Sequence, residues 1–246
     1  WYWIPFLIIA PGLGALLLWF YRRQQQGQQA RTRQLREELL RDLHDEMGSK
    51  LAVVNMYGAL LQDQLSPGDL EKTGPILNKL LGASTDLYQS MQDLQWMLDP
   101  EKDQLRHLLY ELKAFGQELL SPTGAVFQET IELSPDLLGQ KLPIHYKKNV
   151  LFLFKEAIHN TAKHAGATEA GLQVWSTVDH IHICWWDKGG AKPPLAIQGN
   201  GYGLKSMQAR AEKIGAALKF GHDSGGTQVR LRWPVGILLR EEKSVS

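Results

Sequence analysis

The sequence of 246 residues predicts an α+β protein with a membrane helix, an antiparallel helical hairpin and an α/β sandwich, in which helices back a sheet. Three observations lead to this prediction. An almost uncharged run of twenty residues lies near the N-terminus, and two heptad-like apolar repeats follow it. The remainder of the chain alternates between helical and strand-like patterns, which is typical of a sheet covered by helices.

The run at residues 2–21 is about as long as the hydrocarbon core of a bilayer requires. Aromatic residues stand at both of its ends, as in the belts at the two membrane interfaces. Arg22 and Arg23 follow at once, so the positive-inside rule places residues 22–246 in the cytoplasm. We therefore expect a transmembrane helix over residues 1–21. A cleaved signal peptide is the alternative, but no basic segment precedes the run.

Residues 22–34 are rich in Gln and Arg and are predicted to form a helical connector to a hairpin at residues 35–99. Two apolar repeats with steps of three and four predict the two helices of this hairpin. The first repeat contains Leu40, Leu43, Met47, Leu51, Val54, Gly58, Leu61 and Leu65, and the second contains Leu77, Leu80, Ser84, Leu87, Met91, Leu94 and Leu98. The breaker at residues 66–69 separates them, and Thr73 and Pro75 are start signals for the second helix. Because one hairpin cannot bury both seams, two copies are expected to pair as a homodimeric four-helix bundle.

Residues 103–236 are predicted to form the α/β sandwich, and residues 237–246 a C-terminal tail. Helices are expected at residues 103–120, 143–165 and 204–214, and strands at residues 126–133, 170–177, 181–187, 217–220 and 228–233.

The composition excludes several classes of protein. A single cysteine, Cys184, excludes an internal disulfide framework and a multi-thiolate metal site. Because Cys184 lies in an apolar, strand-like run, we expect a buried, unreactive thiol. The formal net charge of +1 gives no bulk attraction to nucleic acid, so direct nucleic-acid binding is not expected.

Leu43-His44-Asp45-Glu46 lies in the first predicted helix of the hairpin. A neutral imidazole is nucleophilic at cellular pH, and a neighbouring carboxylate such as Asp45 can hold one ring nitrogen protonated while the other attacks. One threading of the apolar repeat turns the His44 ring inward. Another, with Leu43 and Met47 in the seam, turns it outward, and both remain open. Alone, a His-Asp pair is more often a solvated helical pair.

The predicted helix at residues 143–165 has two faces. The apolar face contains Val150, Phe154, Ile158, Thr161 and Ala165, and the opposite face contains Glu156, Asn160 and Lys163. The amide oxygen of Asn160 suits Mg²⁺, which prefers oxygen ligands. Glu156 could hold a water of that shell or act in transfer, and Lys163 and His164 could face phosphate oxygens. A solvated side of an amphipathic helix is the alternative reading.

Two further segments carry candidate nucleotide contacts. In the strand at residues 181–187, alternation puts Asp187 at the end of a buried row, where a carboxylate needs a donor such as the exocyclic amine of adenine. A carboxylate that starts a turn before two glycines is the alternative. Gly199-Asn200-Gly201-Tyr202-Gly203-Leu204 precedes a helix, and its glycines let backbone N–H groups approach phosphates. The glycine spacing does not fit a dinucleotide-binding fingerprint. Gly225-Gly226-Thr227 alone reads equally well as a hairpin turn.

Together these motifs resemble those of bacterial sensor histidine kinases, in the branch whose partners are response regulators of the LuxR/NarL type. The resemblance covers about residues 35–235. The matching segments are Arg41-Asp42-Leu43-His44-Asp45-Glu46-Met47-Gly48, Lys155-Glu156-Ala157-Ile158-His159-Asn160 with Lys163-His164-Ala165, Asp187-Lys188-Gly189, Gly201-Tyr202-Gly203-Leu204 with Met207, Arg210 and Ala211, and Gly226-Thr227.

The resemblance implies a phosphotransfer hairpin followed by an ATP-binding domain of the type shared by gyrase, Hsp90, histidine kinases and MutL, in a protein of the bacterial cytoplasmic membrane. His44 would be phosphorylated from ATP with Asp45 as its helper, and the phosphoryl group would pass to an Asp of the regulator's receiver domain. The other implied roles are Mg²⁺ binding by Asn160 with Glu156 on the same helix, adenine recognition by Asp187 with Thr227 nearby, and a lid over the phosphates lined by Gly201 and Gly203. Leu204, the next residue, would also contact the nucleotide. Gly189 would form the turn after Asp187.

Two positions depart from the pattern of the family. Ser49 stands where the family often has a Gln that supports dephosphorylation of the regulator, and Ala191 stands where the first glycine box usually ends in Gly. Three other functions stay open at this stage: another ATPase switch of the same fold, a degenerate kinase that acts as a membrane-tethered binding dimer, and a serine-directed protein kinase of the same fold.

Overall fold

The computed structural model describes residues 47–62, 70–189, 202–223 and 226–236, together with Trp19 and Tyr21. The expected membrane helix, apart from these two aromatic residues, and the expected connector and C-terminal tail lie outside the described residues. In the part of the chain that is described, no helix has the length and apolar character needed to cross a bilayer. The chain divides between Leu94 and Gln95 into two compact units, which we call the hairpin unit and the sheet unit.

The hairpin unit contains a helical segment at residues 47–62 and most of helix α2 (Leu70–Leu98). Lys50 Nζ donates a hydrogen bond to Ser90 Oγ, while Lys79 Nζ lies 5.9 Å from the ring centroid of Tyr57, so the two helices run antiparallel. The predicted start of the second helix was wrong, because α2 begins at Leu70 and Pro75 lies inside it. Near a helix start, a proline removes one backbone hydrogen bond without ending the helix.

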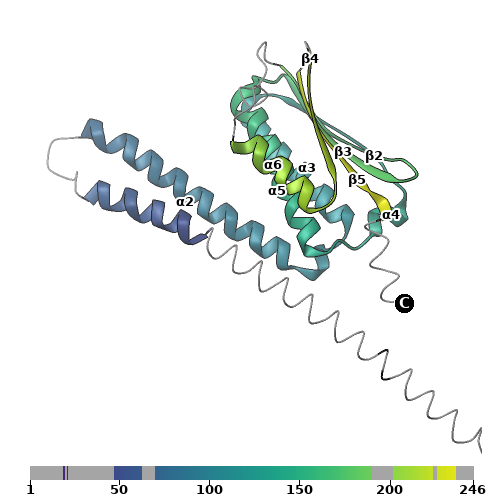
Figure 1. The fold of residues 1–246 in the computed structure, drawn as a ribbon. Helices are drawn as coiled ribbons and strands as arrows, with labels where there is room; N and C mark the ends of the chain where they lie inside the picture. Colours follow the sequence, from purple (N-terminus) through teal and green to yellow (C-terminus); the bar gives the residue numbers. More distant parts are fainter. Residues whose placement is uncertain are drawn as a thin grey trace, which may run out of the picture. The chain divides into compact units, whose positions relative to one another are not determined.

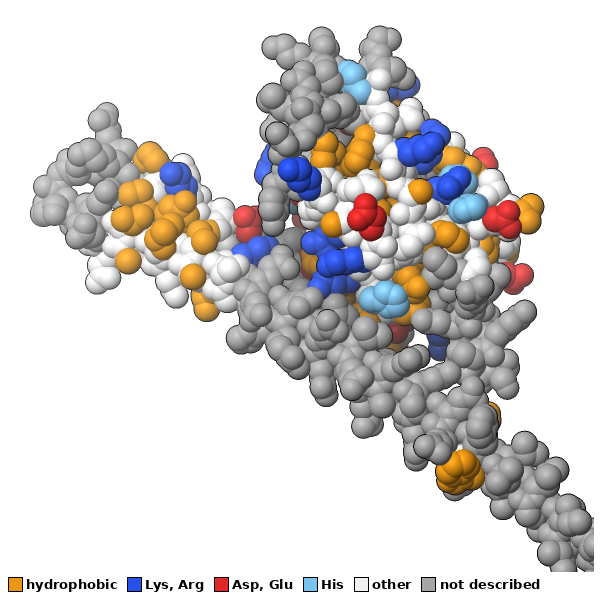
Figure 2. Space-filling model, in the orientation of Figure 1, with side chains coloured by type: hydrophobic (Ala, Val, Ile, Leu, Met, Phe, Trp, Pro, Cys, Tyr) orange, Lys and Arg blue, Asp and Glu red, His pale blue; other side chains and the backbone are white. Residues whose placement is uncertain are grey.

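Apolar side chains remain exposed on the hairpin unit, where Figure 2 shows them gathered over the helices. The exposed set comprises Leu51, Val53, Met56, Leu60, Leu77, Leu81, Tyr88 and Met91. Exposed apolar side chains gathered in this way are typical of an interaction surface.

The sheet unit has five strands in the order β1-β2-β3-β5-β4. The strands are β1 (Val126–Glu132), β2 (Glu169–Ser176), β3 (His180–Lys188), β4 (Ala217–Asp223) and β5 (Gly226–Pro234). Strands β1 and β2 pair in parallel and all other neighbours pair antiparallel, so the sheet is mixed. Helices α3 (Leu105–Leu120), α5 (Ile144–Asn160) and α6 (Tyr202–Lys213) cover one face (Figure 1). This arrangement confirms the predicted α/β sandwich.

Alternation along the strands builds the core between the sheet and the helices. In β3, Ile181, Ile183 and Trp185 are at most 1% exposed, as the strand pattern predicts. Cys184 is also buried, which confirms that prediction, and burial raises the pKa of its thiol. The predicted helix at residues 143–165 is α5 followed by a π-helical turn, η3 (Thr161–Ala165). Three short elements were not predicted: η1 (Pro100–Lys102), η2 (Ser121–Thr123) and α4 (Pro135–Gly139).

Candidate nucleotide-binding site

The end of α5 is held in a fixed rotation by its buried face. Val150, Phe154 and Ile158 have no exposed surface, and Thr161 is 3% exposed, so these four residues face the core as predicted. Glu156 and Asn160 on the opposite side are half-buried, and Lys163 is exposed. Because the buried side is locked by packing, these three polar residues are presented outside the core.

The π-helical turn follows directly after Asn160 and ends at Gly166, whose φ of 52° is in the left-handed region. π-helical turns are rare in proteins, and many of those that occur lie at functional sites. This turn contains Lys163 and His164. The side chain of His164 lies outside the described residues.

Asp187 lies at the end of the buried row of β3 and is 6% exposed. The Thr161 hydroxyl donates to Asp187 Oδ2 at 2.9 Å, and the Thr227 backbone N–H donates to Oδ1 at 3.2 Å. Trp185 Nε1 in turn donates to Thr161 Oγ1 at 2.9 Å. Each carboxylate oxygen thus has one protein donor and retains capacity for a further donor from a ligand.

The electrostatics of Asp187 follow from this burial. Desolvation raises the pKa of its carboxyl group, while the hydrogen bonds from Thr161 and Thr227 and the charge of His222 oppose the rise. A buried carboxylate held by two donors, with free lone pairs, can accept a hydrogen bond from an exocyclic amine. The hydrogen bond from the Thr227 N–H to Asp187 agrees with the expectation that these two residues lie close together.

Two glycines fix the backbone around this carboxylate. Gly226 has a φ of 146°, and a Cβ there would overlap the carbonyl oxygen of Asp187. Gly189 has a φ of 153°, and a Cβ there would lie 2.6 Å from Ala167 Cα. Because only glycine readily allows both the positive φ and the close approach, both positions are constrained to glycine.

A second group of predicted residues meets at the start of α6. Gly203 lies in the first turn of α6, and a Cβ there would overlap the carboxylate oxygen of Glu156. The sheet unit therefore brings Glu156 of α5 against Gly203, a residue of the predicted lid that lies in the first turn of α6. Leu204, the next residue, is half-buried.

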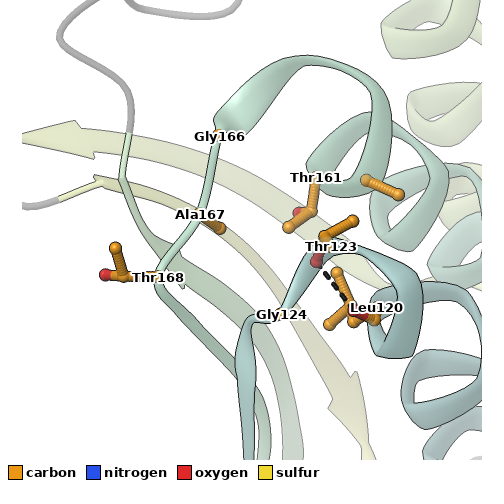
Figure 3. Close-up of a pocket in the computed structure, with 8 residues that line it drawn as sticks. Leu120, Thr123, Gly124, Thr161, Gly166, Ala167 and Thr168 are labelled. Carbon is orange, nitrogen blue, oxygen red and sulfur yellow. Dashed lines mark hydrogen bonds between the residues drawn. The ribbon is translucent and has the colours of Figure 1, made fainter.

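A cavity of about 340 Å³ lies beside the π-helical turn (Figure 3). Its wall includes Thr161, the side chain that holds Asp187, together with Leu120, Thr123, Gly124, Ala162 and residues 166–168. In Figure 3, Thr161 and Thr123 come from separate segments and border the same space. The cavity thus lies between the end of α5 and the residues that precede strands β1 and β2.

The structure places the predicted residues in two groups, Asp187 with Thr227 and Glu156 with Gly203. His44, Asp45 and Gly201 lie outside the described residues, so the approach of the imidazole to this site is an expectation that the structure does not describe. Thr161 was placed on the apolar face of α5 but was not predicted to hold Asp187. A hydroxyl in a buried row needs a hydrogen-bond partner, and this requirement was the available signal.

No family model matches the chain. Among characterised proteins, it is 28% identical over 213 residues to the nitrate/nitrite sensor protein NarQ of Escherichia coli, covering 85% of this chain. It is 24% identical over 208 residues to the signal transduction histidine-protein kinase/phosphatase UhpB of Salmonella typhimurium, covering 81% of this chain. The matched regions make up only 36% of NarQ and 39% of UhpB. These homologues confirm the resemblance that the motifs indicate.

Solved structures of histidine kinases share the fold. The histidine kinase AdeS of Acinetobacter baumannii matches with a TM-score of 0.51 at 11% identity, over 77% of this chain and 96% of AdeS. Full-length ShkA, in complex with AMPPNP, matches with a TM-score of 0.52 at 15% identity, over 80% of this chain and 45% of ShkA. At these identities the likeness shows the fold, which is that of the histidine kinase ATP-binding domain.

Proposed function

We propose that this chain, a homologue of the sensor histidine kinases, transfers a phosphoryl group from ATP to His44 and then to an Asp of a response regulator. The regulator would belong to the LuxR/NarL type and be bound through its receiver domain. The sheet unit is the part that binds ATP, and the hairpin unit is the part that carries the phosphoacceptor.

The observation that carries this proposal is the double anchoring of the Asp187 carboxylate. A buried carboxylate is costly unless its oxygens are hydrogen-bonded, and here two donors hold it while further lone pairs remain available. It lies one hydrogen bond from Thr161, the residue that follows Asn160. The adenine-reading and metal-binding candidates therefore belong to one connected piece of structure.

The chemistry asks little covalent work of the protein, because phosphoryl transfer proceeds mainly through positioning and charge neutralisation. One ring nitrogen of neutral His44 would form a bond to the γ-phosphorus as the bond to the β–γ bridging oxygen breaks, and ADP leaves. Asp45 would hold the N–H of the other ring nitrogen. In the second step the regulator's Asp carboxylate takes the phosphoryl group and His44 is regenerated.

The described residues fit Mg²⁺ bound together with a nucleotide better than a metal site made by protein alone. Among them, no group of three or more His, Cys, Asp and Glu side chains could hold a metal ion. Mg²⁺ bound with substrate phosphates needs only one or two protein oxygens and keeps several waters. Asn160 would supply such an oxygen, Glu156 would hold a water of the shell, and the ion would neutralise phosphate charge.

We propose that the remaining predicted residues contact the phosphates of the nucleotide. Lys163 is exposed beside Asn160 and is free to reach a phosphate as a point charge. Gly201 and Gly203 would line the lid, with Gly203 in the first turn of α6, Leu204 would contact the nucleotide, and Gly189 would form the turn after Asp187. His164 would add a further donor to the nucleotide.

The homodimer is supported by the apolar surface left on the hairpin unit. Leu51, Met56, Leu81 and Met91, for example, are 49–57% exposed in one copy. A second copy that covers these side chains would form the expected four-helix bundle. Insertion in the cytoplasmic membrane through residues 1–21 is proposed from the apolar run and from Arg22 and Arg23 that follow it.

The test is incubation of the purified full chain in detergent with γ-labelled ATP. Wild type should acquire acid-labile, base-stable label, whereas His44→Ala and Asn160→Ala should acquire none. Asn160→Ala should also lose ATP binding, while His44→Ala should keep it. His180→Ala, which changes a histidine of β3, is the matched control and should label like wild type.

Each other outcome assigns a different function. ATP binding and hydrolysis without label on any variant would indicate an ATPase switch of the same fold. Failure of wild type to bind ATP would indicate a degenerate kinase that acts by binding a partner. Label that survives in His44→Ala would mean that another residue accepts the phosphoryl group.

A further inference from the structure

Lys147, in the first turns of α5, has no exposed surface although it carries an ammonium group. Its Nζ donates to the backbone carbonyl oxygens of Trp96, Met97 and Asp99 at 3.1–3.4 Å and to Asp103 Oδ1 at 3.1 Å. The ammonium also lies 4.3 Å from the ring centroid of Trp96. All of these partners lie at the C-terminal end of α2 or in the segment just after it.

The end of α2 needs such a partner. The last four carbonyl oxygens of a helix receive no hydrogen bond from an N–H group of the same helix. Helix α2 also has no basic residue of its own in its last turn. No glycine follows Leu98; the next residue, Asp99, is extended, with φ −72° and ψ 113°. Lys147 therefore supplies from α5 the cation that stabilises a helix C-terminus.

The segment after α2 is bound to the rest of the sheet unit along its whole length. Asp99 caps η1 by accepting the Glu101 N–H, and the Leu142 N–H donates to Asp103 O. The Leu105 N–H donates to Gln140 O, and Gln104 pairs with Lys141 in an antiparallel bridge. A flexible hinge would show few such bonds, because each one must break for the backbone to bend.

Burial makes the contact of Lys147 costly to open. Desolvation lowers the pKa of its ammonium group, and the hydrogen bond and charge of Asp103 oppose this effect. Breaking the contact would leave a buried charge and several carbonyl groups without partners. Met97, which is 1% exposed, would also become accessible to water.

We propose that Lys147 is a positioning residue that locks the last turn of α2, Gln95–Leu98, and the segment 99–104 to the rest of the sheet unit. The sheet unit then approaches the phosphoacceptor by bending of α2 on the N-terminal side of Gln95. In this arrangement the bend lies in α2 and not in the segment 99–104 that connects α2 to α3. The proposal rests on the proposed function, since it concerns how the ATP-binding part reaches His44.

A disulfide across the Gln104–Lys141 bridge tests where the bend lies. The flanking hydrogen bonds, Leu105 N–H to Gln140 O and Leu142 N–H to Asp103 O, mark a non-hydrogen-bonded antiparallel pair. Cα atoms of such pairs are about 4.5 Å apart, which falls within the range that disulfides span. Because Cys184 is buried, Gln104→Cys/Lys141→Cys should form the intended bridge on oxidation.

The oxidised full-length double variant should autophosphorylate at a rate within about twofold of its reduced form, well under the tenfold that 1.4 kcal/mol of barrier represents. The two single cysteine variants, treated with the same oxidant, control for oxidative damage. Loss of label on oxidation, with recovery on reduction, would overturn the proposal, because it would show that the segment 99–104 must open.

Lys147→Met tests the positioning role, because methionine keeps the apolar stem and removes the ammonium. We expect kcat for autophosphorylation to fall roughly tenfold, with little change in KM for ATP, since the nucleotide site lies at the other end of α5. Lys213→Met, at the exposed end of α6, should leave both unchanged. An equal rise in KM, or an unchanged kcat, would contradict a positioning role.

Hydrogen exchange separates this proposal from the proposed function, because it needs no kinase activity. In the full-length wild type, peptides covering residues 95–103 should be protected, with and without a non-hydrolysable ATP analogue. In Lys147→Met the same peptides should exchange faster while those of the sheet core stay protected. Fast exchange at residues 95–103 in wild type would overturn the proposal even if the protein proves to be a kinase.

Discussion

The hydroxyl of Thr161 connects Trp185 in the core of the sheet unit to the carboxylate of Asp187, the residue proposed to read adenine, and its removal gives the sharpest prediction. In Thr161→Val a methyl group replaces the hydroxyl with almost no change of shape. Asp187 then loses the donor to Oδ2, and Trp185 Nε1 loses its acceptor. Both partners are buried, at 6% and 1% exposure, so water cannot readily replace the hydroxyl.

The magnitude follows from the two bonds. A hydrogen bond to a charged group contributes about 1.5–3 kcal/mol, and a buried donor left without an acceptor costs about 1–3 kcal/mol. Since the two bonds share one hydroxyl and the site can relax, we expect about 3 kcal/mol of destabilisation. For a domain of this size that corresponds to a fall in Tm of about 8 °C.

Thermal unfolding of the full chain and the affinity for ATP are the two assays. Thr161→Val should lower both the Tm and the affinity, because Asp187 loses a donor that holds it in place and favours its ionised form. Thr161→Ser is the matched control, since it keeps the hydroxyl and loses only a methyl group. It should retain ATP affinity within about threefold of wild type, less than 1 kcal/mol.

The reasoning would be refuted if Thr161→Val unfolded within about 1 °C of wild type and bound ATP equally well, well below the shift that a lost buried bond gives. The same conclusion would follow if serine and valine had equal effects, because the methyl group rather than the hydroxyl would then matter.

Three further predictions concern the same unit. Asp187→Asn should abolish ATP binding, because an amide offers one acceptor oxygen and its NH2 group would face a donor whose hydrogen bond the carboxylate now accepts. In wild type, burial raises the pKa of the Asp187 carboxyl group above its unfolded value, so the contribution of this group to stability falls as pH rises through that window; the Tm of nucleotide-free Asp187→Asn should lack this part of the pH dependence, and an equal pH dependence of the Tm in both proteins would contradict this. Gly226→Ala should destabilise the sheet unit by about 2 kcal/mol or more in urea unfolding, because a Cβ there overlaps the backbone of Asp187 and the φ of Gly226 is positive. Gly221→Ala is the control, because a Cβ at this exposed position in β4 would make an ordinary contact at 3.6 Å. Cys184 should react with a thiol reagent at pH 8 only after unfolding in urea, since burial raises the pKa of its thiol; fast reaction of the native protein would show that β3 opens.

Local pattern was sufficient for the strands and the long helices of the sheet unit. Alternation in β3 predicted that Ile181, Ile183, Trp185 and Asp187 share one face, and all four are buried there. The helical period likewise predicted which side of α5 faces the core. These predictions succeed because a strand or helix repeats its geometry every two or 3.6 residues, so sequence spacing alone fixes the face.

The boundaries of α2 and the breaks in regular structure were less predictable. Pro75 looked like a start signal but lies within the helix, since the residues before it continue the helix and one missing hydrogen bond is tolerated near its start. The π-helical turn after Asn160 has no signal in hydrophobic period, because it changes the backbone bonding without changing which residues are apolar.

By itself, therefore, the sequence determined the strands and long helices of the sheet unit, the buried faces of β3 and α5, and motifs that resemble those of histidine kinases, because these depend on neighbours along the chain. Only the tertiary structure decided that Thr161 holds Asp187, 26 positions away, and that Lys147 closes the end of α2, 50 positions away at Met97. Such pairs depend on the order of strands and helices in space. A polar side chain in an apolar row must have a partner, but only the packed fold determines which one it meets.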